Sequence, residues 1–250
     1  MSERPFTELV VTARQQLTPG MVRLRFAAAD REVFASAFGG SAFTDRYVKL
    51  VFPQPDGSTV LRTYTALEPD VSAGTLTIDF VVHGTEGIAG PWAAGAEEGD
   101  RILVRGPGGA YAPDPSADWH LFAADESGLP AVRAALAALP PEAAGHAVVH
   151  VPAEEHIQEL DGPVGVDITW VVSTEPDALP EAVRDIAWPA GRVQAFVHGE
   201  AQAVMHGIRP YLLKERGLPR GDVSISGYWR LGRTEEGFRA WKQELTAQER

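Results

Sequence analysis

The sequence of 250 residues predicts a small antiparallel β-barrel followed by a doubly wound α/β domain. The barrel is predicted because the first part of the chain holds short runs rich in Val, Leu, Phe and Thr, separated by turn sequences. The α/β domain is predicted because apolar strand-like runs alternate with helix-like segments after the Pro-rich stretch Ala112–Ser116. We therefore expect a domain boundary near residue 115, between a barrel domain of residues 1–115 and an α/β domain of residues 116–250.

Six strands are expected in the barrel domain. Turn chemistry separates them, as at Thr18–Gly20 and Pro55–Gly57. One short helix is expected after Pro91, because proline is favoured at the first helical position. The expected strands are Glu8–Leu17, Met21–Ala27, Arg46–Phe52, Val60–Ala66, Thr75–His83 and Arg101–Arg105.

The second domain is expected to contain a mostly parallel sheet with helices on both faces. Its expected strands are Trp119–Ala124, His146–Val151, Asp167–Val172, Arg192–His198 and Asp222–Ser226. Its expected helices are Pro130–Leu139, Leu179–Ile186, Ala201–Arg216 and Glu235–Glu249.

The composition excludes several classes of protein. The formal net charge of −12 argues against a nucleic-acid-binding protein. The absence of cysteine excludes disulfides, iron–sulfur clusters and cysteine-based zinc sites. Met1–Pro5 lacks the apolar region of a signal peptide, and no apolar run approaches the ~18 residues of a membrane span. We therefore expect a cytoplasmic protein, with a monomer as the default, and no insertion into a membrane.

No metal site is expected either. His146 and His150 have the spacing of zinc ligands on a helix. They fall in a Val-rich strand, however, where the rise per residue separates them by roughly 13 Å. No other cluster of histidine and acidic residues has the spacing of metal ligands.

The tetrapeptide Arg62–Thr65, at the end of an expected strand, is the most informative motif. Side chains alternate between the faces of a strand, so Arg62 and Tyr64 share one face, while Thr63 and Thr65 share the other. A guanidinium pairs with phosphate, and a phenol ring stacks on a flat ring system. This arrangement suits an anionic ligand with a planar aromatic part, and flavin nucleotides have those parts.

The expected strand Thr75–His83 has a clear apolar face made of Leu76, Ile78, Phe80 and Val82. On the opposite face lie Asp79, Val81 and His83. These three residues can be read in two ways, either as a solvated polar face or as contacts to the ribityl chain or ring of a flavin.

A glycine-rich segment, Gly84–Gly90, precedes the helix that is expected to start at Pro91. The unpaired N–H groups and the dipole of such a helix start favour a phosphate. Trp92, in the first turn, is expected either to cover a base or to pack.

In the second domain, Asp125–Ala131 closes the first strand and opens the next helix, at the edge of the sheet where ligands gather. The segment is neither the Gly-x-Gly-x-x-Gly fingerprint of dinucleotide-binding proteins nor the Gly-x-Ser-x-Gly elbow of hydrolases. The segment Phe196–Ala201 repeats the same strand, glycine and helix pattern. His198 can be read as a ligand residue or as a capping or packing residue, and we favour the second reading. The aromatic and basic cluster Tyr228–Arg230 follows the last expected strand.

Together these segments resemble the siderophore-interacting proteins, a family of flavin-dependent ferric-siderophore reductases. The resemblance covers nearly the whole chain and rests on the order and spacing of six motifs. These motifs are Arg62–Thr65, Asp79–Gly84, Gly90–Ala93, Asp125–Ala131, His198–Ala201 and Gly227–Arg230.

The resemblance implies a ferredoxin-reductase-like fold in which the barrel holds FAD and the α/β domain meets NADH or NADPH, although a ferredoxin can replace that donor. It implies that a few basic residues near the flavin hold an anionic ferric siderophore. The residues that match this role are Lys49, Arg230 and Arg133. The residues implied in flavin binding are Arg62, Thr63, Tyr64, Thr65, Asp79, Val81, His83, Gly90, Pro91, Trp92, Ala93, Ser127 and Trp229.

Two departures from the family pattern stand out. Ser127 and Gly128 occupy positions where the family usually has Thr and Ala, so a hydroxyl is kept. The loop Gly84–Gly90 carries the additional stretch Thr85–Ile88, which leaves the pyrophosphate contacts of this loop open.

The function implied by the resemblance is FAD-dependent reduction of ferric siderophores, which releases Fe(II) with electrons from NAD(P)H or ferredoxin. No catalytic acid or base is assigned, because electron transfer to iron requires none. A general NAD(P)H:flavin or quinone reductase is one alternative. A non-catalytic module that carries siderophore or flavin is another.

Overall fold

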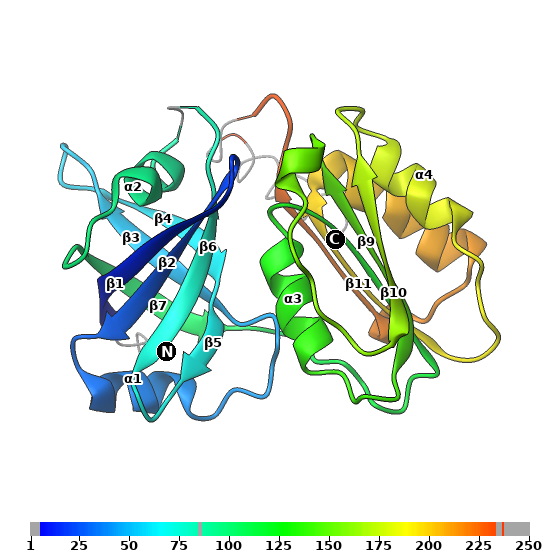
Figure 1. The fold of residues 1–250 in the computed structure, drawn as a ribbon, viewed down its shortest axis with the longest axis horizontal. Coiled ribbons are helices and arrows are strands. Elements are labelled where there is room, and N and C mark those ends of the chain that lie inside the picture. The colour runs from blue at the N-terminus through cyan, green and yellow to red at the C-terminus, as the bar shows by residue number, and fades with distance from the viewer. Residues whose placement is uncertain (1–5, 85–86, 234–236, 238–250) are drawn as a thin grey trace. The chain divides into compact units, whose positions relative to one another are not determined.

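The structure is a computed structural model that describes residues 6–84, 87–233 and 237. It divides into two compact units, each of which is described by itself below (Figure 1). The first unit consists of Met1–Pro113, Arg133–Leu139 and Glu155–Asp161. The second consists of Asp114–Val132, Pro140–Glu154 and Gly162–Arg250.

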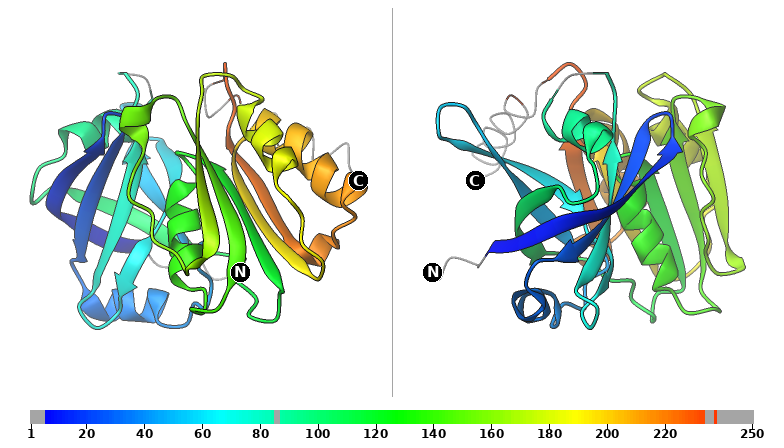
Figure 2. Two further views of the ribbon diagram at one scale, coloured as in Figure 1. Left: turned by 45° about the vertical axis from the view of Figure 1, so that its right-hand side comes forward. Right: turned by 60° about the vertical axis from the view of Figure 1, so that its left-hand side comes forward.

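The first unit is built on a seven-stranded antiparallel sheet with the order β4-β3-β7-β1-β2-β6-β5. The long strand β1 is curved (Figure 2), and its register to β2 shifts between Val11 and Ala13, which marks a β-bulge or irregularity. The strands are β1 Phe6–Thr18, β2 Met21–Ala28, β3 Tyr47–Pro53, β4 Thr59–Thr65, β5 Leu67–Asp70, β6 Thr75–Val81 and β7 Arg101–Gly108.

The predicted barrel strands are present, with three differences. Strand β5 was not expected, because it has only four residues and one of them is Pro69. Strand β6 ends at Val81 rather than at His83, since the chain turns at Gly84, where φ is +55°. Strand β7 continues beyond Arg105 to Gly108.

Two helices accompany this sheet, α1 Arg31–Phe38 and α2 Ala89–Gly95. The sequence predicted only α2. Helix α1 is capped by Asp30, whose carboxylate accepts hydrogen bonds from the N–H groups of Glu32 and Val33 at 2.9 and 3.1 Å. Its buried face consists of the stacked rings of Phe34 and Phe38, 4.3 Å apart. Two apolar anchors over eight residues are too few to reveal a helical period in the sequence.

The second unit contains a five-stranded parallel sheet with the order β10-β9-β8-β11-β12. The antiparallel sheet followed by a parallel α/β sheet confirms the predicted fold class. The strands are β8 Trp119–Asp125, β9 Ala144–Val151, β10 Gly165–Val172, β11 Val193–Glu200 and β12 Val223–Trp229.

The helices of this unit depart from the prediction in one place. Helix α4, Ala178–Asp185, and the start of α3, Leu129–Ala137, lie on opposite sides of the sheet (Figure 1). The segment expected as one α-helix, Ala201–Arg216, is helical from Ala201 to Glu215, but its hydrogen bonding is π-helical over η2 Gln202–Ile208 and η3 Tyr211–Glu215. Pro210 lies between them and has no N–H to continue the hydrogen-bond ladder. The short 3₁₀ turn η4 Arg220–Asp222 belongs to this unit, whereas most of the turn η1 Glu154–His156 belongs to the first.

The expected helix Glu235–Glu249 lies almost wholly outside the described residues. In the part of the chain that the structure describes, no helix is long and apolar enough to cross a membrane.

One buried histidine in β8 should make stability depend on pH. His120 is 2 % exposed, and burial lowers its pKa below the ordinary value of 6.5. The unfolded chain therefore binds this proton more readily than the folded chain. The contribution of His120 to the free energy of unfolding should be fully present above about pH 6.5. Below that pH the free energy of unfolding should fall by up to about 1.4 kcal/mol per pH unit. Urea unfolding between pH 7.5 and 5 measures this slope.

The His120→Asn variant should flatten that slope. His83→Asn is the matched control, because His83 is exposed in the first unit, and it should keep the slope. An unchanged slope in His120→Asn would assign the pH dependence to other groups.

Candidate functional site

The predicted motif Arg62–Thr65 lies on β4, at one edge of the antiparallel sheet. Arg62 is opposite Leu50 of β3, and Tyr64 is opposite Val48, so both face the interior of the unit. Arg62 is 7 % exposed and Tyr64 is half-buried, whereas Thr63 is exposed on the outer face. The alternation predicted for this strand is therefore present. Thr65 is buried at the end of the strand.

Three of the predicted motifs meet around Phe80 of β6. The ring of Tyr64 on β4 lies 4.5 Å from the ring of Phe80. The indole of Trp92 on α2 contacts the same ring edge-on at 5.9 Å and also contacts Phe52 at 5.7 Å. The indole of Trp92 therefore packs on two core rings, and its contact with a base stays a prediction. The three motifs, which are separate in the sequence, thus form one neighbourhood.

The start of α2 lies against the end of β6. A Cβ atom on Gly90 would come within 3.2 Å of the carbonyl oxygen of Val81, so glycine permits this close approach. Ile88, at the N-cap, offers no side-chain acceptor to the first-turn N–H groups of the helix. Pro91 and Ala93 belong to this helix. Thr85 and Glu86 lie outside the described residues.

These groups have the chemistry that FAD requires. Arg62 supplies a cation, Tyr64 an aromatic face and Thr65 a hydroxyl, and the first turn of α2 supplies N–H donors. All of them belong to the first unit. The residues present therefore fit a flavin nucleotide.

Asp79 has a protein partner that the sequence did not indicate. Its carboxylate accepts two hydrogen bonds from the guanidinium of Arg23 on β2, at 2.7 and 2.8 Å. The hydrogen bond to Asp79 raises the pKa of Arg23. Because Asp79 is only 3 % exposed, the solvated reading does not hold for this residue. Val81 is half-buried at the strand end, and His83 is exposed beyond it.

Lys49 lies on the outer face of β3, next to the motif strand. Its cross-strand neighbours are Thr63 on β4 and Arg105 on β7. Arg105 is also exposed, and its guanidinium lies 4.6 Å from the centre of the Phe6 ring. Among the described residues, no carboxylate forms an ion pair with Lys49. The sequence did not indicate Arg105 as a neighbour of Lys49, because only the strand register brings the two residues opposite each other.

Arg133 is engaged by the first unit itself. Its guanidinium donates to the carbonyl oxygen of Glu159 at 2.9 Å and to Oε1 of Gln158 at 3.3 Å. Burial lowers its pKa. This arginine ties a helix to a neighbouring loop segment, and its contact with a siderophore stays a prediction.

In the second unit, the predicted residues gather around Asp125 at the carboxyl end of β8. The Ser127 hydroxyl donates to this carboxylate at 2.5 Å, and the Trp229 indole N–H donates to it at 2.7 Å. Arg230 lies 3.5 Å from Glu200. Sequence reasoning quoted Asp125 within a motif but gave it no role, since nothing in the sequence shows that one carboxylate gathers these groups.

His198 has the packing role that the sequence suggested. It is buried, with Nδ1 2.6 Å from the Tyr228 hydroxyl and Nε2 3.1 Å from the Ser224 hydroxyl. Its ring stacks on Phe196 at 3.9 Å. The two strand histidines are held separately, His146 by Thr169 and His150 by the carbonyl oxygen of Ser173. The described residues contain no cluster of three or more histidines and carboxylates that could hold a metal.

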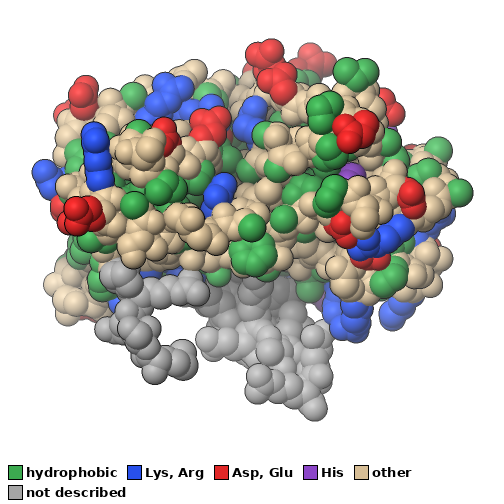
Figure 3. Space-filling model, turned by 90° about the horizontal axis from the view of Figure 1, so that it is seen from below, with side chains coloured by type: hydrophobic (Ala, Val, Ile, Leu, Met, Phe, Trp, Pro, Cys, Tyr) green, Lys and Arg blue, Asp and Glu red, His purple; other side chains and the backbone are tan. Residues whose placement is uncertain are grey.

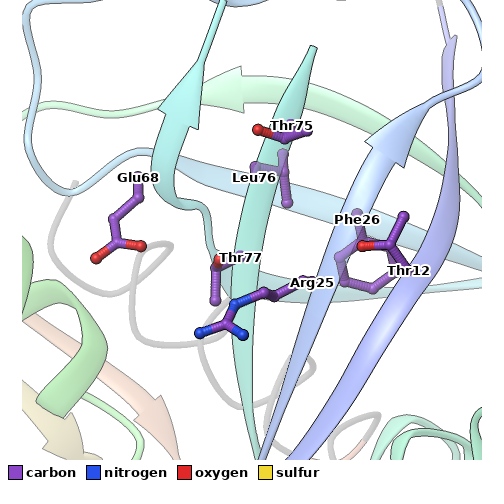
Figure 4. A pocket seen from close by; sticks show the side chains of 7 residues that line it. All are labelled: Thr12, Arg25, Phe26, Glu68, Thr75, Leu76 and Thr77. Atoms are coloured by element: carbon purple, nitrogen blue, oxygen red, sulfur yellow. The ribbon is translucent and has the colours of Figure 1, made fainter. Parts of the chain in front are cut away.

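A pocket of about 270 Å³ opens in the first unit, away from the predicted motifs. Figure 4 shows Arg25 of β2 extending toward Thr77, with Glu68 of β5 beside them. None of the predicted flavin residues lines it, so it does not define the candidate site. Its lining residues are Thr12, Arg25, Phe26, Glu68, Thr75, Leu76 and Thr77.

Acidic and basic side chains are interspersed on the face of the molecule shown in Figure 3. Because the net charge is −12, an anionic ligand needs local basic residues to approach this chain.

Comparisons with family models match both parts of the chain. Residues 56–111 match the model described as "Siderophore-interacting FAD-binding domain". Residues 117–232 match the model described as "Siderophore-interacting protein".

Three relatives extend this similarity. An uncharacterized protein of Mycobacterium tuberculosis is 44 % identical over 283 residues, covering 100 % of this chain and 99 % of the relative. The ferric vibriobactin reductase ViuB of Vibrio cholerae is 34 % identical over 192 residues, covering 74 % of this chain and 69 % of the relative. An NADPH-dependent ferric-chelate reductase of Escherichia coli is 27 % identical over 248 residues, covering 90 % and 92 %.

Solved structures agree with the fold. A siderophore utilization protein from T. fusca superposes with a TM-score of 0.79 at 37 % identity, covering 92 % of this chain and 94 % of that chain. The ferredoxin reductase of carbazole 1,9a-dioxygenase superposes with a TM-score of 0.72 at 15 % identity, covering 90 % of this chain and 70 % of that chain. The second likeness shows a ferredoxin-reductase-like fold.

Proposed function

Because the chain belongs to the siderophore-interacting protein family, we propose that it is an FAD-dependent reductase of ferric siderophores. One observation carries the proposal. Arg62 and Tyr64 share the inner face of β4, and Tyr64 meets Trp92 of α2 around Phe80, within the segment that matches an FAD-binding domain. The names of the two reductases above support the choice of substrate.

In this proposal the first unit holds the cofactor. Arg62 would pair with a phosphate of FAD, Tyr64 would offer its ring to the flat ring system, and Thr65 would offer a hydroxyl to the edge of that system. Val81, His83 and the start of α2 lie alongside. Asp79 acts through Arg23, because the ion pair between the two side chains joins β6 to β2. The exposed Thr63 lies on the Lys49 side of the strand.

When bound, FAD supplies the conversion of a two-electron hydride donor into single electrons. The overall reaction is balanced when one NAD(P)H reduces two ferric ions and releases one proton. Fe(II) carries less charge than Fe(III) and binds hard oxygen donors more weakly, so reduction loosens the chelate. The role of the protein is to bind and position FAD and to attract the ferric siderophore. Lys49 and Arg230 attract the anionic chelate against the net negative charge.

Replacing both Lys49 and Arg230 with alanine should raise KM for an anionic ferric siderophore about tenfold or more and leave FAD binding unchanged. Each lost charge contact weakens binding of an anion, whereas neither residue is needed for FAD. Steady-state ferric reduction under anaerobic conditions gives KM, and flavin absorbance gives the FAD content. Lys214→Ala removes an exposed lysine of the second unit and serves as the control. Unchanged kinetics in the double variant would remove both residues from the substrate site.

The central test is anaerobic reduction of the FAD-loaded protein. NADH, NADPH and a reduced ferredoxin are compared as donors, and bleaching of the flavin absorbance is the readout. Addition of a ferric siderophore should restore the flavin colour and yield Fe(II), which a ferrous chelator detects.

Three outcomes would contradict the proposal. Faster turnover with free flavin or quinone than with ferric siderophores would favour a general reductase. Failure to bleach with all three donors would favour a non-catalytic carrier of siderophore or flavin. A protein that cannot be reconstituted with FAD would refute the cofactor itself.

A further inference from the structure

The parallel sheet has one place where a dinucleotide is expected to bind. Its order, β10-β9-β8-β11-β12, reverses between β8 and β11. In open α/β sheets, ligands bind outside the carboxyl ends of the strands at this switch point, with a diphosphate at the N-terminus of the following helix. Here that position is the turn from β8 into α3.

The chain fills this position with its own anion. The carboxylate of Asp125, the last residue of β8, accepts hydrogen bonds from the N–H groups of Ser127 and Gly128 at 2.8 and 3.3 Å. From across the switch point it accepts the N–H of Glu200, at the end of β11, at 2.7 Å. With the Ser127 hydroxyl and the Trp229 indole, five donors converge on a side chain of a residue that is 8 % exposed.

The glycines of this edge serve the carboxylate rather than a ligand. In a dinucleotide fingerprint, glycines let the backbone approach the pyrophosphate. Here a Cβ atom on Gly199 of β11 would lie 2.9 Å from the carboxyl carbon of Asp125. A Cβ atom on Gly128 would collide with the carbonyl oxygen of His198. Both glycines therefore make room for the chain's own packing across the switch point.

A second carboxylate reinforces the first. Glu200 accepts hydrogen bonds from the N–H of Ala203 at 2.8 Å and from that of Leu231 at 3.1 Å. A diphosphate entering this edge would have to displace Asp125 from its donors and would meet the charge of Glu200 as well. Like charges brought together in this way disfavour binding.

We infer that Asp125 is a specificity-determining residue that closes the switch point to the diphosphate of a dinucleotide. The electron donor of the proposed reaction therefore reaches the flavin without placing a diphosphate between β8 and β11. The inference rests on the proposed function only in assuming that the protein takes electrons from a donor. The closure itself concerns the second unit alone.

Titration of the FAD-loaded protein with NADP⁺ and with ADP tests the closure directly. Amide chemical shifts of Ser127, Gly128 and Glu200 report on the N–H groups that Asp125 occupies. We expect no saturable shift at these three amides up to millimolar nucleotide. Shifts confined to other residues agree with the inference, because the donor then binds elsewhere. A saturable shift at these three amides overturns it.

The Asp125→Ala variant tests the residue itself. Removing the carboxylate frees the N–H groups, so ADP should bind at least tenfold more tightly than to the unchanged protein. Asp167→Ala is the matched control, because Asp167 is an exposed carboxylate on β10 and its removal changes the net charge equally. A folded Asp125→Ala variant without this gain overturns the inference. If that variant does not fold, the titration of the unchanged protein decides.

These outcomes are separate from the proposed function. Nucleotide titration needs neither flavin reduction nor a siderophore. A protein that fails to reduce ferric siderophores can still show the closed switch point. Conversely, an active reductase whose Ser127 and Glu200 amides respond to ADP refutes the closure alone.

Discussion

Replacing Arg62 with alanine is expected to weaken FAD binding by about tenfold to one-hundredfold. A hydrogen bond to a charged group contributes about 1.5–3 kcal/mol, and each 1.4 kcal/mol is a factor of ten in affinity. Arg62 is the buried cation of the motif strand, so a phosphate bound to it would be partly shielded from water. Equilibrium titration of the apoprotein with FAD measures the effect. Arg62→Lys should recover only part of the affinity, because lysine keeps the charge but not the planar fork.

Arg25→Ala is the matched control for this experiment. Arg25 is an exposed arginine of β2 in the same unit. It lines the 270 Å³ pocket, and none of the predicted flavin residues lines that pocket. Its removal should leave FAD affinity unchanged. If Arg62→Ala binds FAD as tightly as the unchanged protein does, Arg62 is not a phosphate contact. Thermal unfolding of each apoprotein separates loss of the site from loss of the fold.

Breaking the Arg23–Asp79 ion pair is expected to have the largest effect on stability. The side chain of Asp79 is 1 % exposed and that of Arg23 is 17 % exposed, so removing one partner leaves a charge away from water. Removal of one member of a buried pair typically costs about 3–5 kcal/mol. We expect Asp79→Ala to lose about that amount in urea unfolding. The double variant Arg23→Met, Asp79→Leu should be more stable than either Arg23→Met or Asp79→Ala, since no buried charge then remains unpaired.

The same double variant decides the role of Asp79. If Asp79 acts through Arg23, the folded double variant should keep most of its FAD affinity. If the carboxylate itself contacts the flavin, the double variant should lose FAD while it remains folded. A double variant less stable than both single variants would contradict the structural role.

The candidate site shows how far local pattern reaches. The period of two along β4 was enough to place Arg62 and Tyr64 on one face, because the alternation of a strand is a local property. The same period placed Asp79 and Phe80 on opposite faces of β6. It could not identify Arg23 as the partner of Asp79, because Arg23 is 56 residues away in the sequence. Arg105 and Lys49 became neighbours only through the register of β3 and β7. Register depends on pairing between distant segments, which a single strand does not encode.

The prediction of secondary structure differed from the structure at two helices for similar reasons. Helix α1 depends on two phenylalanines that pack into the core, and its helical period is too short to recognise. The segment after β11 is helical as predicted, yet π-helical geometry replaces α-helical geometry on both sides of Pro210. Both outcomes follow from tertiary packing and a missing donor rather than from propensity.

The sequence alone determined the two-part fold class, the strand that carries Arg62 and Tyr64, and the family, because each rests on local periodicity or on the order of short motifs. The tertiary structure alone decided how the polar groups are paired. In the folded chain Asp79 pairs with Arg23, and Arg133 donates hydrogen bonds to Gln158 and Glu159. The donors at the edge of the parallel sheet bind the carboxylate of Asp125. The physical reason is that a buried charge must find a partner, and that partner is chosen by which segments fold together rather than by neighbours in the chain.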